Sequence, residues 1–290
     1  MRRVRTVALV THRRPAEVTG ALEELRDLAR AADVTLSIDP EEAAKHSWLV
    51  GEGVVVRATE ETPAKDADLC VVLGGDGTTL SALRLYAGTG VPVFGVNFGV
   101  VGFLTTVDRE NRLDGLRRAL AGDFEVLTLP AIEVTGARGR WLAVNDASMH
   151  RQQGMRVADL EYSVGDEEVG RVRCDGLVVA TPAGSTGYNL ANGGPVMAWG
   201  VAGYVVSFIA PHSFTARTLV VAPDDLMTIG NCSREEPVDV TIDGRPVCTL
   251  EAGERLSTRF VADQGTLAQL PGTTFYQRLR EKFGRLATPL

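Results

Sequence analysis

Three glycines surround one aspartate early in the chain, at Gly74-Gly75-Asp76-Gly77. The apolar run 68–73 predicts a buried strand before this turn, and residues 79–86 predict the start of a helix after it. Backbone N–H groups converge at a helix start and the helix dipole favours an anion there, which is typical of a phosphate site. The carboxylate of Asp76 repels phosphate and is better suited to take a proton from a neighbouring hydroxyl. The pattern indicates phosphoryl transfer to an alcohol, although an Asp-Gly turn with a helix cap would use the same residues.

A second polar turn follows the apolar strand expected over residues 177–180. Residues 181–191 are rich in Gly, Ser, Thr and Ala, whose small side chains let a flat polar ligand approach the backbone, and Tyr188 could stack on a ring. Asn145 and Asp146 follow another short strand, where an amide and a carboxylate can hold ribose hydroxyls or base edges. Both features also have purely structural interpretations, as a β-turn with surface hydroxyls and as an Asx turn.

Composition narrows the class of protein. The chain has 290 residues, enough for one large or two ordinary domains, and 44% of them are hydrophobic, as in a globular protein. The net charge of −7 does not favour a nucleic-acid partner, and we expect neither a signal peptide nor a membrane span. The four cysteines are scattered, with neither metal-ligand spacing nor a disulfide pattern, which predicts no metal site and a cytoplasmic location.

Lysine is nearly absent, and this excludes several enzyme classes. The lysines are Lys45, Lys65 and Lys282, so none follows the glycine turn as a P-loop requires. The strand lysine of protein kinases and the amine of Schiff-base enzymes are also missing near the turn.

Strands and helices are expected to alternate over residues 1–122, which favours an α/β domain with a Rossmann-like parallel sheet. Pro15 is expected to open a helix whose apolar face contains Leu22, Leu25, Leu28 and Ala29. The other expected elements are strands at 4–10, 34–38, 68–73 and 91–96 and helices at 41–46, 79–86 and 109–121.

The rest of the chain has a different sequence pattern. Residues 123–270 contain short β-like runs broken by turn residues, which indicates an all-β sandwich domain. Residues 271–290 are expected to return to helix, with an apolar stripe that packs on the body of the protein. The members of this stripe are Phe275, Tyr276, Leu279, Phe283 and Leu286.

The order of the motifs resembles the NAD kinase family. Gly74–Thr78 is shared with diacylglycerol-type lipid kinases and phosphofructokinases and is weakly specific, whereas Asp175–Tyr188 is strongly specific. The other segments that carry the resemblance are Gly95–Thr105, Asn145-Asp146, Pro211–Arg217 and Asp243-Gly244-Arg245.

This resemblance implies an N-terminal α/β domain, a C-terminal β-sandwich and a tail that returns to the first domain. It implies that the adenosine-ribose 2′-hydroxyl of NAD attacks the γ-phosphate of ATP to give NADP, with Asp76 as general base and Mg²⁺ carried on ATP. It also implies small nucleotides as partners and a homodimer or homotetramer.

By the same resemblance, two sets of residues contact the nucleotides. The glycine turn would bind phosphate through Gly74, Gly75, Gly77 and Thr78, and Asp76 and Gly77 would also lie against the dinucleotide. The remaining implied contacts are Asn145, Asp146, Arg156, Arg173, Asp175, Thr186, Gly187, Tyr188, Asn189, Leu190, Ala191, Ala210 and Arg245.

Departures from the family pattern line the expected dinucleotide pocket and leave substrate choice open. Asp146 is shorter than the usual Glu, Gly187 replaces a usual Ala, and residues 147–150 are more polar than the pattern. Arg173 either accompanies a preference for NAD over NADH, as in the family, or is a solvated arginine on a strand edge. The alternative functions are a kinase for another hydroxyl (NADH, a nucleoside or a lipid) and a non-catalytic dinucleotide sensor, which would have no need of Asp76.

Overall fold

The computed structural model describes residues 3–57 and 66–284, so Lys65 and Leu286 lie outside the described residues. The chain forms two compact units: Met1–Thr128 with Gly265–Leu290 is unit 1, and Leu129–Gln264 is unit 2. The chain passes between them inside two long strands, β7 (Glu125–Gly136) and β18 (Arg255–Gln269). The boundaries expected from the sequence lie after residues 122 and 270.

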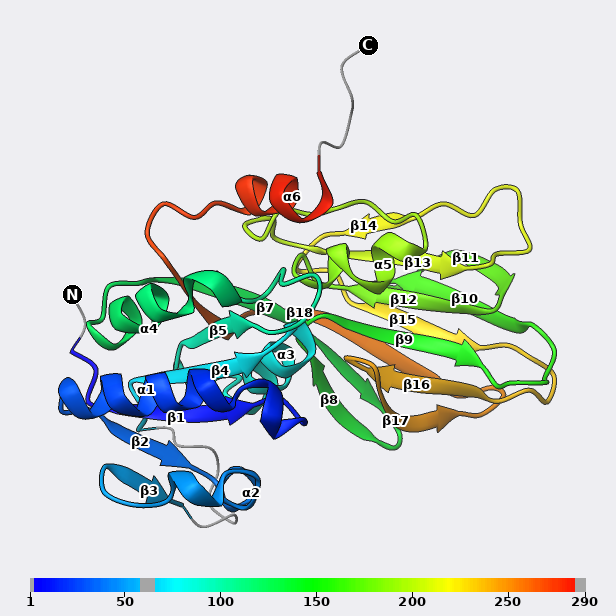
Figure 1. Cartoon of the computed structure of the whole chain (residues 1–290). Coiled ribbons are helices and arrows are strands. Elements are labelled where there is room, and N and C mark those ends of the chain that lie inside the picture. Colours follow the sequence, from blue (N-terminus) through cyan, green and yellow to red (C-terminus); the bar gives the residue numbers. More distant parts are fainter. Residues whose placement is uncertain (1–2, 58–65, 285–290) are drawn as a thin grey trace. The chain divides into compact units, whose positions relative to one another are not determined.

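Unit 1 is built on a parallel sheet with the strand order β3-β2-β1-β4-β5 (Figure 1). The short β6 and the end of β18, where Leu267 lies opposite Val93, also pair with β5 in parallel. The sheet confirms the expected α/β domain, but the pattern does not reveal β3 and β6, because each is only two or three residues long. The strands are β1 Thr6–Thr11, β2 Thr35–Ile38, β3 Val54–Val56, β4 Leu69–Gly74, β5 Val93–Asn97 and β6 Val107–Asp108.

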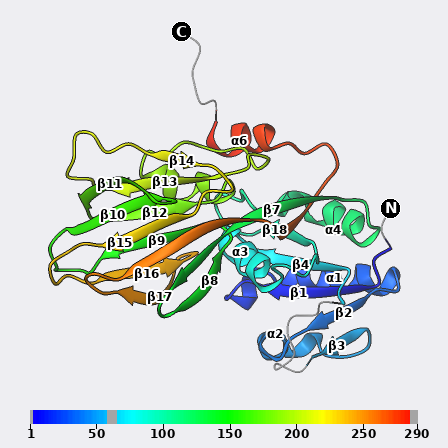
Figure 2. The same ribbon diagram turned by 180° about the vertical axis from the view of Figure 1, so that it is seen from behind.

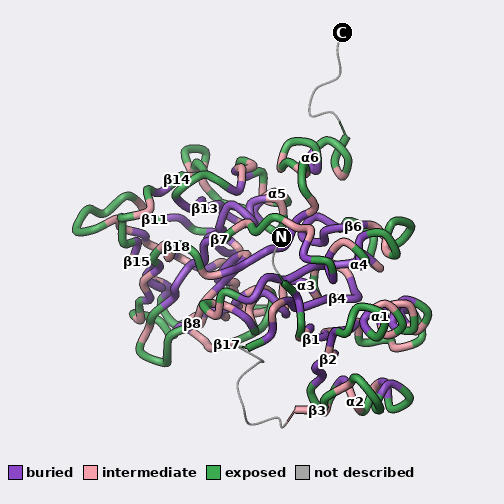
Figure 3. Tube along the Cα trace, turned by 90° about the vertical axis from the view of Figure 1, so that its left-hand side faces the viewer, coloured by how far each residue is buried: buried purple, intermediate pink, exposed green. Residues whose placement is uncertain are grey.

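Helices connect these strands and cover the sheet. Pro15 begins a 3-10 turn and α1 starts only at Thr19, so the expectation that Pro15 opens this helix is wrong by one turn. The expected apolar face of α1 buries Leu22, Leu25 and Ala29 against α4 and the strands, while its outer side is exposed (Figure 3). The helices are α1 Thr19–Ala31, α2 Pro40–Lys45, α3 Asp76–Leu85, α4 Arg112–Leu120 and α6 Phe275–Phe283, with 3-10 turns at Pro15–Glu17, Ser47–Leu49 and Arg109–Asn111.

The tail of the chain adds α6 to unit 1. The hydroxyl of Thr274 caps this helix by accepting the N–H of Gln277 at 3.1 Å. The rings of Phe275 and Phe283 pack on Phe103, with centroids 5.8 and 5.7 Å away. Leu279 is buried, but Tyr276 is 70% exposed and does not belong to the packed stripe. Among residues 3–57 and 66–284, no helix combines the length and the apolar character needed to cross a membrane.

Unit 2 consists almost wholly of antiparallel strands (Figure 2). One sheet has the order β14-β13-β12-β9-β16-β17, the strands β11-β10-β15-β18 form another, and β7 pairs with β8 and β18. Its helical elements are the 3-10 turn Gly184–Thr186 and the four-residue α5, Tyr188–Ala191. The remaining strands are β8 Gly139–Ala143, β9 Asp146–Arg151, β10 Ala158–Val164, β11 Glu167–Cys174, β12 Gly176–Ala180, β13 Tyr204–Ile209, β14 Leu219–Val221, β15 Met227–Asn231, β16 Val238–Ile242 and β17 Arg245–Leu250.

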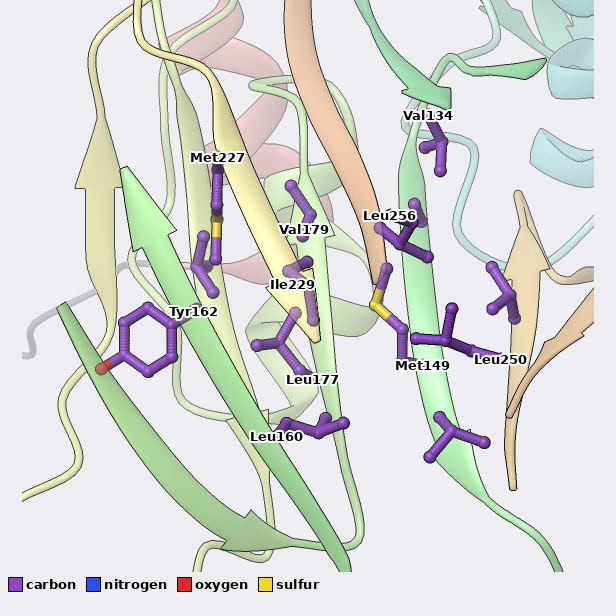
Figure 4. Close-up of a cluster of buried hydrophobic side chains, with 14 of the residues drawn as sticks. Val134, Met149, Leu160, Tyr162, Leu177, Val179, Met227, Ile229, Leu250 and Leu256 are labelled. Carbon is purple, nitrogen blue, oxygen red and sulfur yellow. The ribbon is translucent and has the colours of Figure 1, made fainter. Parts of the chain in front are cut away.

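The core of unit 2 lies between its two sheets (Figure 4). Leu160, Ile229 and Leu256 enter it from β10, β15 and β18, while Met149 and Leu177 enter it from β9 and β12 of the other sheet. Strands such as β16 alternate buried and half-buried residues, so each presents one apolar face to this core. This arrangement confirms the expected β-sandwich.

Candidate functional site

The glycine turn lies at the point where the strand order of unit 1 reverses. β1 is followed in sequence by β2 on one side, whereas β4 is followed by β5 on the other, and β4 and α3 flank the turn. Ligands of open α/β sheets bind outside the carboxyl ends of the strands at such a switch point. Crowding restricts the first two glycines to small residues: a Cβ on Gly74 would lie 2.5 Å from Thr78 Oγ1, and one on Gly75 would lie 3.3 Å from Gly99 Cα.

Asp76, the first residue of α3, is held by the backbone of a neighbouring loop. Its Oδ1 accepts the N–H of Leu104 at 2.7 Å, and its Oδ2 accepts the N–H of Phe103 at 2.9 Å. A carboxylate has about four acceptor positions, so each oxygen keeps one for a ligand. Gly77 is exposed and Thr78 half-buried beside this carboxylate. The structure therefore offers an oriented proton acceptor next to free backbone N–H groups.

The loop that holds Asp76 belongs to the expected motif 95–105, but the sequence does not reveal this contact, because backbone amides leave no side-chain signal. Asn97 shapes the loop by accepting the N–H of Gly99 at 2.9 Å. Gly102 has a φ of +72°, and a Cβ there would lie 2.2 Å from Asn97 Nδ2, so only glycine fits.

Two arginines also follow β1 at the switch point. The N–H of His12 donates to the carbonyl of Leu73 at 2.8 Å, which places Arg13 and Arg14 just beyond the strand end, where both are exposed. Cations in this position suit a phosphate ligand. These two arginines are not among the site residues expected from the sequence, since only the strand order reveals that β1 and β4 are neighbours.

In unit 2, the Asp243 side chain is hydrogen-bonded to the backbone of the turn that carries Asn145 and Asp146. Its carboxylate accepts the N–H groups of Val144, Asn145 and Asp146 at 3.1, 2.7 and 3.2 Å. Asp146 is only 8% exposed, and burial together with the Asp243 carboxylate raises the pKa of Asp146 to about 7. Asp243 belongs to one of the motifs that carry the family resemblance, but no role of its own is expected for it from the sequence.

The segment 181–191 is tied to the same turn. Thr181 donates its N–H to the carbonyl of Asn145 at 2.8 Å and its hydroxyl to the carbonyl of Val144 at 2.7 Å. Gly184 packs so tightly that a Cβ there would lie 2.0 Å from the Asn145 carbonyl oxygen. The structure thus brings the Asn145-Asp146 pair and this segment together, as the binding hypothesis requires.

Residues 186–191 differ in how far they are exposed to solvent. Thr186 and Leu190 are half-buried, and Gly187, Tyr188 and Ala191 are exposed. Asn189 is buried and its amide donates to the carbonyls of Ser185 and Pro195, both at 3.0 Å. Its side chain therefore holds the local backbone together.

Arg173, Asp175 and Ala210 lie close together near the start of β12. The N–H of Asp175 donates to Ile209 at 2.9 Å, next to Ala210, and the carboxylate of Asp175 pairs with Arg151. Arg173 is exposed and its carbonyl accepts the N–H of His212 at 2.7 Å. Two further expected contacts are exposed elsewhere in unit 2, Arg156 in the turn after β9 and Arg245 at the start of β17.

Within the described ranges, His, Cys, Asp and Glu side chains form no group of three that could hold a metal ion. The four cysteines are free, and burial raises the pKa of Cys174 to about 12, which keeps that thiol protonated and inert.

Comparison with known proteins places both units in one family. Residues 4–124 match the ATP-NAD kinase N-terminal domain, and residues 144–263 match the ATP-NAD kinase C-terminal domain. The chain is 36% identical over 285 residues to the NAD kinase of Gemmatimonas aurantiaca, covering 96% of this chain and 95% of that protein. It is 38% identical over 231 residues to the NAD kinase of Symbiobacterium thermophilum, covering 78% and 82% of the two chains.

Solved structures share the fold. A yeast NADH kinase complexed with NADH matches with a TM-score of 0.87 at 20% identity, over 100% of this chain and 90% of that one. An NAD kinase from Archaeoglobus fulgidus in complex with ATP matches with a TM-score of 0.72 at 24% identity, over 96% and 97%. Since the two domain matches span most of the sequence, the chain belongs to the ATP-NAD kinase family.

Proposed function

We propose that the protein transfers the γ-phosphate of ATP to the adenosine-ribose 2′-hydroxyl of NAD and so makes NADP. The observation that carries this proposal is the Asp76 carboxylate, oriented by two backbone amides beside a glycine turn at the switch point. A ribose hydroxyl is a weak nucleophile that needs a positioned base and an aligned phosphate. Relatives named NAD kinase, at 36% and 38% identity, support the choice of substrates.

The chain's residues take the following roles in this proposal. Asp76 accepts the hydroxyl proton through a lone pair that the loop amides leave open. The N–H groups of Gly75 and Gly77 and the hydroxyl of Thr78 bind phosphate oxygens, with Gly74 keeping the turn compact. In unit 2, the dinucleotide contacts are Asn145, Asp146, Arg156, Arg173, Asp175, Ala210, Arg245 and the segment 186–191.

Mg²⁺ would arrive on the phosphates of ATP and neutralise part of their charge. The turn fits a cation brought in this way, because it offers N–H groups to phosphate oxygens and a carboxylate with open acceptor positions. We also propose that the protein works in the cytoplasm as a homodimer or homotetramer.

The proposal is tested by incubating the purified protein with NAD, ATP and Mg²⁺ and measuring NADP with an NADP-specific dehydrogenase. Asp76→Asn should lower kcat by about 10²-fold to 10⁴-fold, the usual contribution of a general base, while NAD binding by calorimetry stays within a few-fold. Asp114→Asn is the matched control, because it removes another carboxylate from the first turn of a helix and is exposed.

Other acceptors separate the alternatives. NADH is the first to include, because the yeast relative in the structural comparison is named an NADH kinase. Activity with NADH, a nucleoside or a lipid in place of NAD would change the substrate assignment. Tight NAD binding without turnover of any acceptor would identify a sensor, and equal loss of binding and rate in Asp76→Asn would contradict the base role.

A further inference from the structure

An arginine from the tail helix is buried beneath the loop that holds Asp76. Arg278 lies on α6 and is only 5% exposed. Its Nη1 donates to the carbonyl of Phe103 at 2.8 Å and to the carbonyl of Thr105, and its Nη2 donates to Oε1 of Gln269. These three acceptors are neutral oxygens, and two of them are carbonyls of the loop backbone.

One peptide group of this loop connects Arg278 to Asp76. The carbonyl oxygen of the Phe103–Leu104 peptide accepts from Arg278, and the N–H of the same peptide donates to Asp76 Oδ1. A cation on the carbonyl polarises the amide and strengthens the hydrogen bond that its N–H donates. The bond also fixes the peptide plane, and with it the direction from which Asp76 is held.

We propose that Arg278 is a positioning residue for the reaction: through the Phe103–Leu104 peptide it sets the orientation of the Asp76 carboxylate, and this makes the tail helix a part of the catalytic machinery. The inference rests on the proposed function, because it assigns a role only if Asp76 is the base.

The surroundings of Arg278 suit this role. Burial lowers the pKa of Arg278 to about 10, while the carboxylates of Asp76, Asp108 and Glu281 oppose this shift, so the side chain is a cation at neutral pH. The rings of Phe275 and Phe283, on either side of Arg278 in α6, pack on Phe103 and seat the helix on the loop. A planar fork of donors can reach two carbonyls and an amide oxygen together, which a lysine ammonium on a flexible stem matches poorly.

The first test separates rate from binding. In Arg278→Ala, kcat for NADP formation should fall by about 10-fold to 100-fold, while KM for NAD and for ATP stays within about threefold, since Arg278 is buried and bonds to the loop backbone. Arg278→Lys should recover part of kcat because it restores a donor and the charge. Arg280→Ala is the matched control, an exposed arginine on the same helix, and its kinetics should equal those of the parent protein.

A double-mutant cycle with Asp76→Asn decides between positioning and general stabilisation. If Arg278 acts through Asp76, Arg278→Ala should change the residual rate of the Asp76→Asn protein by less than about twofold. A second loss as large as that in the parent protein would overturn the proposal, as would a rise in both KM values with kcat unchanged. If Arg278→Ala does not fold, Arg278→Lys in both backgrounds completes the same cycle. Absence of NADP formation by the parent protein would instead overturn the proposed function.

Discussion

The rings of His150 and Tyr188 stack, with centroids 5.5 Å apart and planes inclined by 16°. Ser148 Oγ lies 2.9 Å from Nε2 of His150 and fixes the imidazole, and burial lowers the pKa of His150, so the ring is neutral at pH 7. One face of Tyr188 is thus covered from within unit 2, and the residue is still 36% exposed.

Removing this aromatic face should weaken NAD binding. Tyr188→Leu is expected to raise KM for NAD by about 10-fold to 100-fold, because stacking of a base on an aromatic side chain contributes about 1–3 kcal/mol. Tyr188→Phe keeps the ring and should change KM by less than about threefold. An unchanged KM in the leucine variant would show that Tyr188 only covers His150.

Asp243 should stabilise unit 2 through the three N–H groups that it accepts. Asp243→Ala is expected to lower the free energy of unfolding by about 3–5 kcal/mol, measured by urea denaturation, because it leaves several donors unpaired and puts alanine at a φ of +48°. Asp263→Ala is the control, since this exposed residue has a φ of +54° and should lose only about 1–2 kcal/mol. Equal losses in the two variants would mean that the hydrogen bonds contribute little.

Stability should depend on pH through Asp146. The pKa of Asp146 is about 7 in the folded protein, above the ordinary value of 3.8, so the native state holds this proton more tightly than the unfolded chain. The resulting stabilisation is complete below pH 3.8 and is lost as the pH rises through 7. Asp146→Asn cannot ionise and should lack this dependence.

Urea unfolding at pH 5 and at pH 8 measures the effect. The parent protein should lose about 2–3 kcal/mol more than Asp146→Asn between these two values. Parallel behaviour of the two proteins would show that the carboxyl of Asp146 titrates at an ordinary pKa.

Replacement by alanine should change the stability of the protein to different extents at two glycines of the segment 181–191. Gly184→Ala places a Cβ 2.0 Å from a backbone oxygen that cannot move freely, so a loss of about 2–3 kcal/mol or a failure to fold is expected. Gly187 has a φ of −98°, and its Cβ would meet only the Gly184 oxygen at 3.3 Å. Gly187→Ala should therefore stay within about 1 kcal/mol of the parent protein in thermal or urea unfolding. A large loss in Gly187→Ala would mean that the backbone at this position, with a ψ of −122°, does not accept a Cβ.

Elements with a strong pattern could be predicted from the sequence. β4 and α3 around the glycine turn, and the face of α1 formed by Leu22, Leu25 and Ala29, follow from apolar runs and helical periodicity. The expectation that Tyr276 belongs to the packed stripe is wrong, because periodicity over a nine-residue helix does not fix which edge of an apolar stripe is covered.

The parts of the site that depend on long-range contacts could not be predicted. Asp243 meets Asn145 only after β16 has paired with β9, and Asp76 meets backbone amides, which carry no residue-specific signal. Arg278 lies between Phe275 and Leu279 on the apolar face of its helix, where an arginine is unusual, and this position is a sign in the sequence of its special role. Its burial is seen only in the structure.

Unit 1 is completed by a segment that follows unit 2 in the sequence, so its parts are synthesised at different times. The turn with Asp76 leaves the ribosome early, but Leu267, which pairs with β5, and Arg278, which anchors the loop, emerge only after all of unit 2. Since chains fold from the N-terminus as they are made, the nascent unit 1 lacks the β18 partner of β5 and the arginine that bonds to Phe103 until unit 2 has been made. A chain interrupted within unit 2 therefore carries the glycine motif and the two loop amides that hold Asp76, but it lacks Arg278, which anchors that loop.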